Sequence, residues 1–295
     1  MKKTVFQGAA TALITPMNEQ GVNYPALKKL IDWQIEEGID ALVICGTTGE
    51  GATLSDQEHR EVLQFALEAA AGRVPMIAGT GSNDTAYAID MTRHACEMGY
   101  DAVLVVTPYY NKATQKGLIA SFTAIAQAST KPVILYNVPS RTGVSIEPAT
   151  AAKLAEVENI VAIKEASGNI SKVVELAALA GDKLDIYSGN DDQIVPIMAC
   201  GGVGVISVLS NVLPKETSQM CHKMLQGDVA GAMEMQKQYL GLTNALFSEV
   251  NPIPVKAAMA HLGFCENYLR LPLTPMEKDH EEKLLAYMRE VGLQV

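Results

Sequence analysis

Length, composition and charge describe an ordinary globular protein and exclude several classes. The chain has 295 residues, of which 48% are hydrophobic and 19% charged, so it can bury a large core and lacks the composition of a disordered protein. A formal net charge of -10, without a cluster of Lys and Arg, argues against nucleic-acid binding. Its 5 cysteines form no C-x-x-C pair, which predicts free thiols in a reducing compartment.

The N-terminal stretch and the apolar segments predict a cytoplasmic protein that does not enter a membrane. Gln7, Gly8 and Thr11 interrupt the first mildly apolar stretch, so the core of a signal peptide does not form. No run approaches the roughly eighteen apolar residues of a membrane span. We therefore expect neither a nucleic-acid partner nor a membrane partner.

Along the chain, short runs rich in Val and Ile alternate with longer amphipathic segments. The runs follow one another at roughly 25 to 35 residues, a spacing that suits a βαβ unit. Their continuous apolar character is typical of parallel strands covered on both faces. The eight predicted strands are residues 9–15, 41–45, 74–78, 102–107, 133–137, 160–164, 184–188 and 203–208.

The segments between these strands carry helix signals. Pro25 lies at a helix start, and that helix ends before Gly38. Ser55 begins a capping box, and Asn83-Asp84 is suited to cap the next helix. Eight such repeats without a linker favour a closed (β/α)8 barrel of the α/β class. A doubly wound open sheet is the competing architecture, and the absence of a G-x-G-x-x-G motif weakens it.

After about residue 227 the strand pattern stops. Helices are predicted at residues 229–246, 255–262 and 277–291. We therefore expect a catalytic barrel over residues 1–226 and a C-terminal helical domain over residues 227–295. Packing against the barrel or against a neighbouring subunit is the expected role of the second segment.

The carboxyl ends of the strands are where a barrel of this type forms its active site. Lys164 closes one apolar strand, a position where partial desolvation favours the neutral, nucleophilic amine. Such an amine is suited to form an imine with a carbonyl substrate. A lysine that reaches solvent or pairs with Glu165 is an equally good interpretation of this position taken alone.

Three hydroxyl side chains lie at the ends of two other predicted strands. Tyr136 ends the preceding strand, where a phenol can move protons during imine formation, although a buried tyrosine more often only bonds the backbone. Thr47 and Thr48 lie in a glycine-flanked turn whose hydroxyl and N–H groups are suited to a carboxylate. A tight turn that caps the next helix explains them equally well. The turn lacks the lysine and the spacing of a P-loop.

A guanidinium and an acidic cluster also follow strands. Arg141 is the only arginine between Arg93 and Arg270, and its planar fork can bind a carboxylate with two hydrogen bonds. A surface salt bridge is the alternative. The sequence Asn190-Asp191-Asp192 is expected to be a helix N-cap and not a metal site. The five histidines show no ligand spacing, so no metal is expected.

Taken together, these strand ends resemble a known family, the pyruvate-dependent class I aldolases that include dihydrodipicolinate synthase and N-acetylneuraminate lyase. The resemblance covers essentially the whole chain, from residues 11–16 (TALITP) to residues 251–256 (NPIPVK). Residues 46–50 (GTTGE) and 163–165 (IKE) match the family as a whole. Residues 136–143 (YNVPSRTG) and 107–111 (TPYYN) resemble the synthases, and the sialic-acid lyases do not carry an arginine at position 141.

The resemblance implies a reaction and its participants. Pyruvate and L-aspartate 4-semialdehyde would condense to 4-hydroxy-tetrahydrodipicolinate, the first committed step of diaminopimelate and lysine biosynthesis. Lys164 would form the imine, so no cofactor is needed. Tyr136, Thr47 and Tyr110 would form a proton relay, with Tyr110 supplied by a neighbouring subunit of a homotetramer built as a dimer of dimers. The residues implied to bind substrates are Thr47, Thr48, Arg141, Gly189 and Ile206.

A second, regulatory site is also implied. Family members that lysine inhibits bind it at a dimer interface. The corresponding positions here are Gly51, Ala52, Leu54, Asp56, His59, Asn83, Tyr87 and Tyr109. The inhibited bacterial enzymes have histidine at position 56 and glutamate at position 87. Because Tyr87 offers no carboxylate to the ammonium group of lysine, we expect weak or absent feedback inhibition.

Two alternatives stay open. One is another pyruvate-dependent aldolase, which acts on N-acetylneuraminate or on a keto-deoxy sugar acid; Arg141 and the Tyr109-Tyr110 pair argue against it. The other is a non-catalytic binding paralogue on the same barrel. Against this one stands the joint presence of Lys164, Tyr136 and the other candidates.

Overall fold

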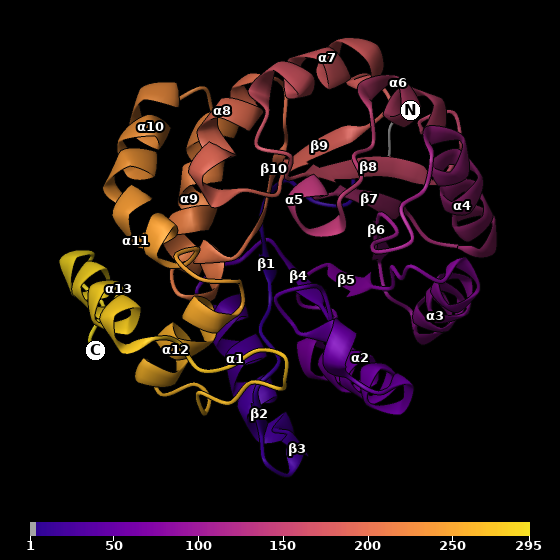
Figure 1. Ribbon diagram of the computed structural model, residues 1–295. Helices are drawn as coiled ribbons and strands as arrows, with labels where there is room; N and C mark the ends of the chain where they lie inside the picture. The colour runs from indigo at the N-terminus through magenta and orange to yellow at the C-terminus, as the bar shows by residue number, and fades with distance from the viewer. Residues whose placement is uncertain (1–3) are drawn as a thin grey trace.

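The computed structural model describes residues 4–295, and its centre is a closed barrel of parallel strands (Figure 1). The barrel order is β1-β10-β9-β8-β7-β6-β5-β4, so each strand pairs with its neighbours in the chain and β10 closes on β1. The (β/α)8 prediction is confirmed, and the doubly wound sheet is excluded. The barrel strands are β1 (Gly8–Ala12), β4 (Ala41–Ile44), β5 (Met76–Gly79), β6 (Ala102–Val106), β7 (Val133–Asn137), β8 (Ile160–Glu165), β9 (Asp185–Ser188) and β10 (Gly204–Ser207).

Helices follow the strands and cover the outside of the barrel (Figure 1). The capping box at Ser55 is confirmed, because its side chain accepts from the N–H of Glu58 while the Glu58 carboxylate accepts from the N–H of Ser55. Asp84, and not Asn83, caps the next helix. These helices are α1 (Tyr24–Glu36), α2 (Asp56–Ala70), α3 (Thr85–Met98), α4 (Gln115–Ala128), α6 (Pro148–Leu154), α7 (Ile170–Ala180), α8 (Ile194–Ala199) and α9 (Pro214–Leu225).

Short elements occupy the connections. The hairpin β2 (Met17–Asn18) and β3 (Gly21–Val22) precedes α1. A single turn of helix, α5 (Pro139–Thr142), follows β7. The remaining short elements are η1 (Gly51–Thr53), η2 (Asp191–Gln193) and η3 (Leu209–Asn211).

The C-terminal segment is helical, as predicted, but its first part is not one helix. Residues 229–246 form α10 (Val229–Gln238) and α11 (Leu240–Ala245), which meet at Tyr239, whose φ of -94 and ψ of 1 leave the helical range. Two more helices follow, α12 (Ile253–His261) and α13 (Lys278–Glu290). Figure 1 shows α10 to α13 gathered on one side of the barrel, beside α9 and α1. Within residues 4–295, no helix combines the length and the apolar character that crossing a membrane requires.

The core has two layers, which follow from the alternation of side chains along each strand. Side chains such as Ile134, Tyr136 and Ala162 pack together inside the barrel. Side chains such as Leu135 and Ile163 pack outward against the helices. Every second residue of a strand shares a face, so residue 164 points to the same interior as residue 162.

Candidate active site

Tyr136 and Lys164 face each other across neighbouring strands inside the barrel. They are register partners of β7 and β8. Both are buried, with 7% of Tyr136 and 5% of Lys164 exposed, and the Lys164 Nζ lies 4.4 Å from the centroid of the Tyr136 ring. The two neighbouring strand ends therefore bring the candidate amine and the candidate phenol into contact. An ammonium group over the face of a phenol ring is a favourable cation–π arrangement.

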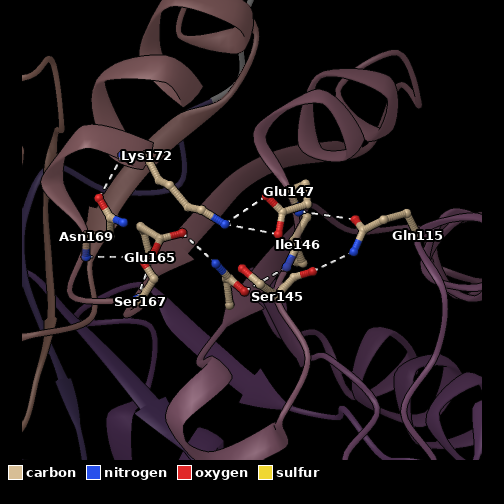
Figure 2. A network of polar contacts seen from close by, with 9 residues as sticks. Gln115, Ser145, Ile146, Glu147, Glu165, Ser167, Asn169 and Lys172 are labelled. Carbon is tan, nitrogen blue, oxygen red and sulfur yellow. Dashed lines mark hydrogen bonds and ion pairs between the residues drawn. The ribbon is translucent and has the colours of Figure 1, made fainter.

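The alternative interpretation, in which Lys164 pairs with Glu165, is wrong. Glu165 points to the opposite face of β8, where its carboxylate accepts from Asn137 Nδ2 at 2.8 Å and from the N–H of Ser167 at 2.7 Å. Figure 2 shows Glu165 within a polar network that continues to Ser167 and Asn169. Over residues 4–295, no carboxylate lies within ion-pair distance of Lys164. The Asn137–Glu165 bond joins the ends of β7 and β8 and so fixes the two strand positions next to Tyr136 and Lys164.

The acidic cluster after β9 has a different role from the predicted one. Asn190 is at the N-cap position of η2, but its side chain makes no cap hydrogen bond. Asp191 is buried, and its Oδ2 accepts from the N–H groups of Val208 and Leu209, both at 2.9 Å. Burial raises the pKa of Asp191. The carboxylate therefore holds the chain after β10, and the prediction of a local N-cap is wrong.

A cavity of about 540 Å³ opens at the carboxyl ends of these strands. Thr47, which follows β4, lines it, and so do Tyr136 and Arg141, which lie at the end of β7 and directly after it. Among the described residues, the lining does not include Thr48, Lys164, Gly189 or Ile206. The amine of Lys164 contacts the ring of Tyr136, which is itself a lining residue of the cavity.

The turn that carries Thr47 and Thr48 is tightly folded. Cys45 and Glu50, at its two ends, have φ values of 57 and 54, in the left-handed region. The N–H of Glu50 donates to the Thr47 carbonyl at 3.1 Å, which closes the turn. Thr47 is exposed, whereas Thr48 is buried and its Oγ1 accepts from Asn251 Nδ2 at 3.0 Å. The turn thus presents one free hydroxyl to the cavity and holds the other by a hydrogen bond.

Arg141 lies on α5, the short helix that follows β7. One of its guanidinium nitrogens donates to the Asn251 carbonyl at 3.2 Å. No carboxylate of the described chain pairs with it, so the surface salt bridge is not what holds this side chain. The remaining N–H groups of an exposed guanidinium at a cavity wall are available to an anion.

Gly189 and Ile206 lie close to the Tyr136–Lys164 pair. A Cβ at position 189 would stand 2.7 Å from the Ala166 Cβ, which is a clash, and 3.1 Å from Lys164 Cε, so glycine fits tightly beside the lysine. Ile206 is fully buried and packs in the same interior cluster as Tyr136. The two residues therefore shape the space around the amine from behind the cavity wall.

Tyr110 does not reach the cavity of its own chain. It is 93% exposed and its backbone has a φ of 69, which is strained for a non-glycine residue. Within residues 4–295, no hydrogen bond joins Tyr110 or Tyr136 to Thr47, so a single chain does not form the relay of three hydroxyls.

Six of the eight positions that are implied to bind inhibitory lysine line the same cavity as Tyr136. His59 is buried, its Nε2 lies 3.0 Å from the Gly79 carbonyl, and burial lowers its pKa. Asp56 lies outside the lining, and its hydrogen bonds with Arg60 and Tyr87 lower its pKa. The six lining positions are Gly51, Ala52, Leu54, His59, Tyr87 and Tyr109.

Three residues near the site had no role in the sequence prediction: Lys256, Glu50 and Asn251. Lys256, on α12, has no exposed surface, and its Nζ forms an ion pair with the carboxylate of Glu50. Asn251 holds both Thr48 and Arg141. The lone lysine in the apolar stretch 253–259 indicates a buried charge. Its partner, Glu50, lies 206 residues away in the sequence, so spacing cannot identify that partner.

Over residues 4–295, no cluster of three or more His, Cys, Asp or Glu side chains is placed to hold a metal ion. The hydroxyl of Thr47, the phenol of Tyr136 and the guanidinium of Arg141 line the cavity, and the Lys164 amine contacts the Tyr136 ring.

Comparisons with known proteins agree with this geometry. The model of the Dihydrodipicolinate synthetase family matches residues 5–291. A 4-hydroxy-tetrahydrodipicolinate synthase of Lachnoclostridium phytofermentans is 56% identical, over 98% of this chain and 99% of that protein. The dihydrodipicolinate synthase of Aquifex aeolicus is 47% identical with a TM-score of 0.96, over 98% of this chain and 99% of that one. The chloride-inhibited enzyme of Acinetobacter baumannii, solved with pyruvate, is 43% identical with a TM-score of 0.96, over 99% and 100%. The chain belongs to the dihydrodipicolinate synthetase family.

Proposed function

We propose that this protein is an enzyme that condenses pyruvate with L-aspartate 4-semialdehyde to 4-hydroxy-tetrahydrodipicolinate, in diaminopimelate and lysine biosynthesis. Its family membership and its full-length similarity to synthases of this name support the reaction. The observation that carries the proposal is the buried Lys164 amine, which faces Tyr136 and has no ion-pair partner in the described chain.

The reaction begins at Lys164. Its neutral amine adds to the keto carbon of pyruvate, and loss of water gives an imine. The imine loses a C3 proton and becomes an enamine, whose C3 attacks the aldehyde carbon of the semialdehyde. The amine of the second substrate then displaces Lys164 from the former keto carbon and closes the ring, which regenerates the lysine.

Proton transfer is assigned to Tyr136, Thr47 and Tyr110. Tyr136 is adjacent to the amine, and Thr47 lines the same cavity. The exposed, strained Tyr110 supports a contribution to the cavity of another copy of the chain, so we propose a homo-oligomer, a dimer of dimers. A phenol at this place can accept the proton that leaves the amine and return it to the departing hydroxyl.

The two carboxylates of the substrates need separate sites. The Thr47–Thr48 turn is assigned to the pyruvate carboxylate and Arg141 to that of the semialdehyde, with Gly189 and Ile206 around the imine. The arginine also separates this function from the N-acetylneuraminate and keto-deoxy-sugar-acid lyases. A binding paralogue has no need of an unpaired buried amine.

Weak or absent inhibition by lysine remains part of the proposal. Tyr87 contributes no carboxylate, and Asp56 is already engaged by Arg60 and Tyr87. Half-inhibition by submillimolar lysine in a steady-state assay would contradict this. We also propose the cytoplasm as the location, which the free cysteines support, and a division between a barrel at 1–226 and a helical domain at 227–295, of which residues 1–3 lie outside the described part.

A steady-state comparison of substrates tests the function. We expect turnover of pyruvate with L-aspartate 4-semialdehyde and no cleavage of N-acetylneuraminate. Replacing Arg141 by Lys keeps the charge but loses the fork, so it is expected to raise the KM for the semialdehyde about tenfold or more and to leave that for pyruvate nearly unchanged. Preferred cleavage of a sugar acid would overturn the proposal.

A further inference from the structure

Lys256 and Glu50 form a fully buried ion pair between the C-terminal helices and the turn of the candidate site. The side chains of Lys256 and Glu50 are 0% and 1% exposed. Lys256 lies on α12, and Glu50 closes the turn that begins after β4. Burial lowers the pKa of Lys256, and the neighbouring carboxylate of Glu50 opposes this shift. The pair is the one bridge of full burial among the ion pairs of residues 4–295.

Stability alone does not account for such a pair. Removing two charges from water costs about as much free energy as their attraction returns, and apolar side chains of similar volume often stabilise a protein more. The neighbours of Lys256 on α12 are apolar and buried, so a methionine would suit this position. The second oxygen of Glu50, Oε2, is buried and has no hydrogen-bond partner in the described chain. What the pair does supply is a directional link between two segments far apart in the sequence.

Glu50 transmits this link to Thr47. The N–H of Glu50 donates to the Thr47 carbonyl at 3.1 Å, and its own carbonyl accepts from the N–H of Thr53 at 3.0 Å. Its φ of 54 is a conformation that a glutamate adopts only when its surroundings impose it. Fixing the carboxylate at Lys256 therefore fixes the backbone position from which Thr47 faces the cavity.

The same segment also holds the other two groups assigned to carboxylates. Asn251, just before α12, donates from Nδ2 to Thr48 Oγ1 at 3.0 Å and accepts from Arg141 at its carbonyl, at 3.2 Å. The segment just before α12 thus contacts the turn at one wall of the cavity and the arginine at another. Lys256 anchors this helix to the turn about one and a half turns further along.

We infer that Lys256, Glu50 and Asn251 are positioning residues that set the Thr47–Thr48 turn at the distance from Lys164 that pyruvate requires. The inference rests on the proposed function, since it assigns the turn to the pyruvate carboxylate. None of the three touches the reacting atoms. Their loss weakens capture of pyruvate more than it slows the chemistry of bound pyruvate.

The test measures imine formation directly, by trapping pyruvate on the full chain with borohydride over a range of pyruvate concentrations. The variants are Lys256→Met, Glu50→Gln, the double variant with both changes, and Asn251→Ala. In the double variant no buried charge is left without a partner, so only the link is missing. We expect its half-saturating pyruvate concentration to rise about tenfold, with a change of less than about threefold in the maximal trapping rate. Asn251→Ala, which leaves the pair intact, is expected to shift half-saturation in the same direction.

Val255→Ala is the matched control, because Val255 is buried on the same helix and takes part in neither the ion pair nor the hydrogen bonds to the turn. It loosens α12 by a small cavity and is expected to trap pyruvate as the unchanged protein does. Half-saturation within about twofold of the unchanged protein, for both the double variant and Asn251→Ala, would overturn the inference. An equal shift in Val255→Ala would overturn it as well, because it would assign the effect to general loosening. Failure of the unchanged protein to trap pyruvate is a different outcome, which rejects the proposed function itself.

Discussion

The two buried lysines of this chain have opposite surroundings. Lys164, at the end of a barrel strand, faces the ring of Tyr136, and no carboxylate of the described chain pairs with it. Lys256, on α12, is more deeply buried and is held by Glu50. A carboxylate in contact with an amine favours its charged, non-nucleophilic form. Burial alone therefore does not identify a reactive lysine; the absence of an ion-pair partner and contact with a side chain that lines the cavity do.

The largest expected effect is that of removing the unpaired lysine. Lys164→Met is expected to lower kcat by about 10⁴-fold or more, because the covalent route is lost. The free energy of unfolding should stay the same or rise, since a charge without an ionic partner leaves the core. Steady-state kinetics and urea unfolding measure both quantities. Lys183→Met, which removes an exposed lysine paired with Glu156, is the control for a lysine change without consequence.

The second-largest effect is expected from removing the hydroxyl of Tyr136. Tyr136→Phe keeps the ring over Lys164 and removes only the hydroxyl, so kcat is expected to fall about a hundredfold or more with little change in Tm. Tyr187→Phe is the matched control, because Tyr187 is a buried tyrosine of the same interior cluster whose hydroxyl donates to the Phe6 carbonyl at 2.7 Å. Equal kcat losses in the two variants would mean that Tyr136, too, has only a structural role.

Removing the paired lysine, Lys256, is expected to affect stability more than catalysis. Lys256→Met leaves the buried carboxylate of Glu50 without its cation, so the free energy of unfolding is expected to fall by about 3–5 kcal/mol. Adding Glu50→Gln should restore much of that loss, which urea unfolding of the two variants would reveal. A single variant as stable as the unchanged protein would show that the pair is not desolvated as the structure has it.

The smallest expected effect concerns a partly exposed ion pair, Arg270–Glu58, in contrast to the buried pair Lys256–Glu50. The Arg270 guanidinium beside Glu58 lowers the pKa of that carboxyl to about 2, from 4.5. Because the pKa of the folded state is the lower one, this stabilisation is present above pH 4.5 and is lost as the pH falls towards 2. Both side chains are partly exposed, so Glu58→Gln should lower the free energy of unfolding by about 0.5–1 kcal/mol at neutral pH. Urea unfolding at several pH values checks this, and a difference between the two proteins that persists at pH 2 would contradict it.

Most of the fold could be predicted from the sequence, because the strands are continuous apolar runs and the helices carry local signals. The capping box at Ser55 is an example, since all its partners lie within four residues. The break at Tyr239 could not be predicted, because the helical pattern continues through it and tertiary packing decides the local backbone.

The candidate site was predictable only in part. Strand-end position placed Tyr136 and Lys164 together, since parallel register brings equivalent ends side by side. The roles of Asn251 and Lys256 could not be derived, because their partners depend on how the C-terminal helices pack on the barrel. Asp191 was assigned to the wrong contact for the same reason, since the groups it holds belong to another strand end.

Mass mapping after borohydride reduction with pyruvate tests the central distinction most directly. Reduction of an imine would leave one carboxyethyl group on the lysine nitrogen. The unpaired amine of Lys164 is predicted to carry it, and Lys256, held by Glu50, is predicted to stay unmodified. An adduct on Lys256, or no adduct on any lysine, would contradict the account.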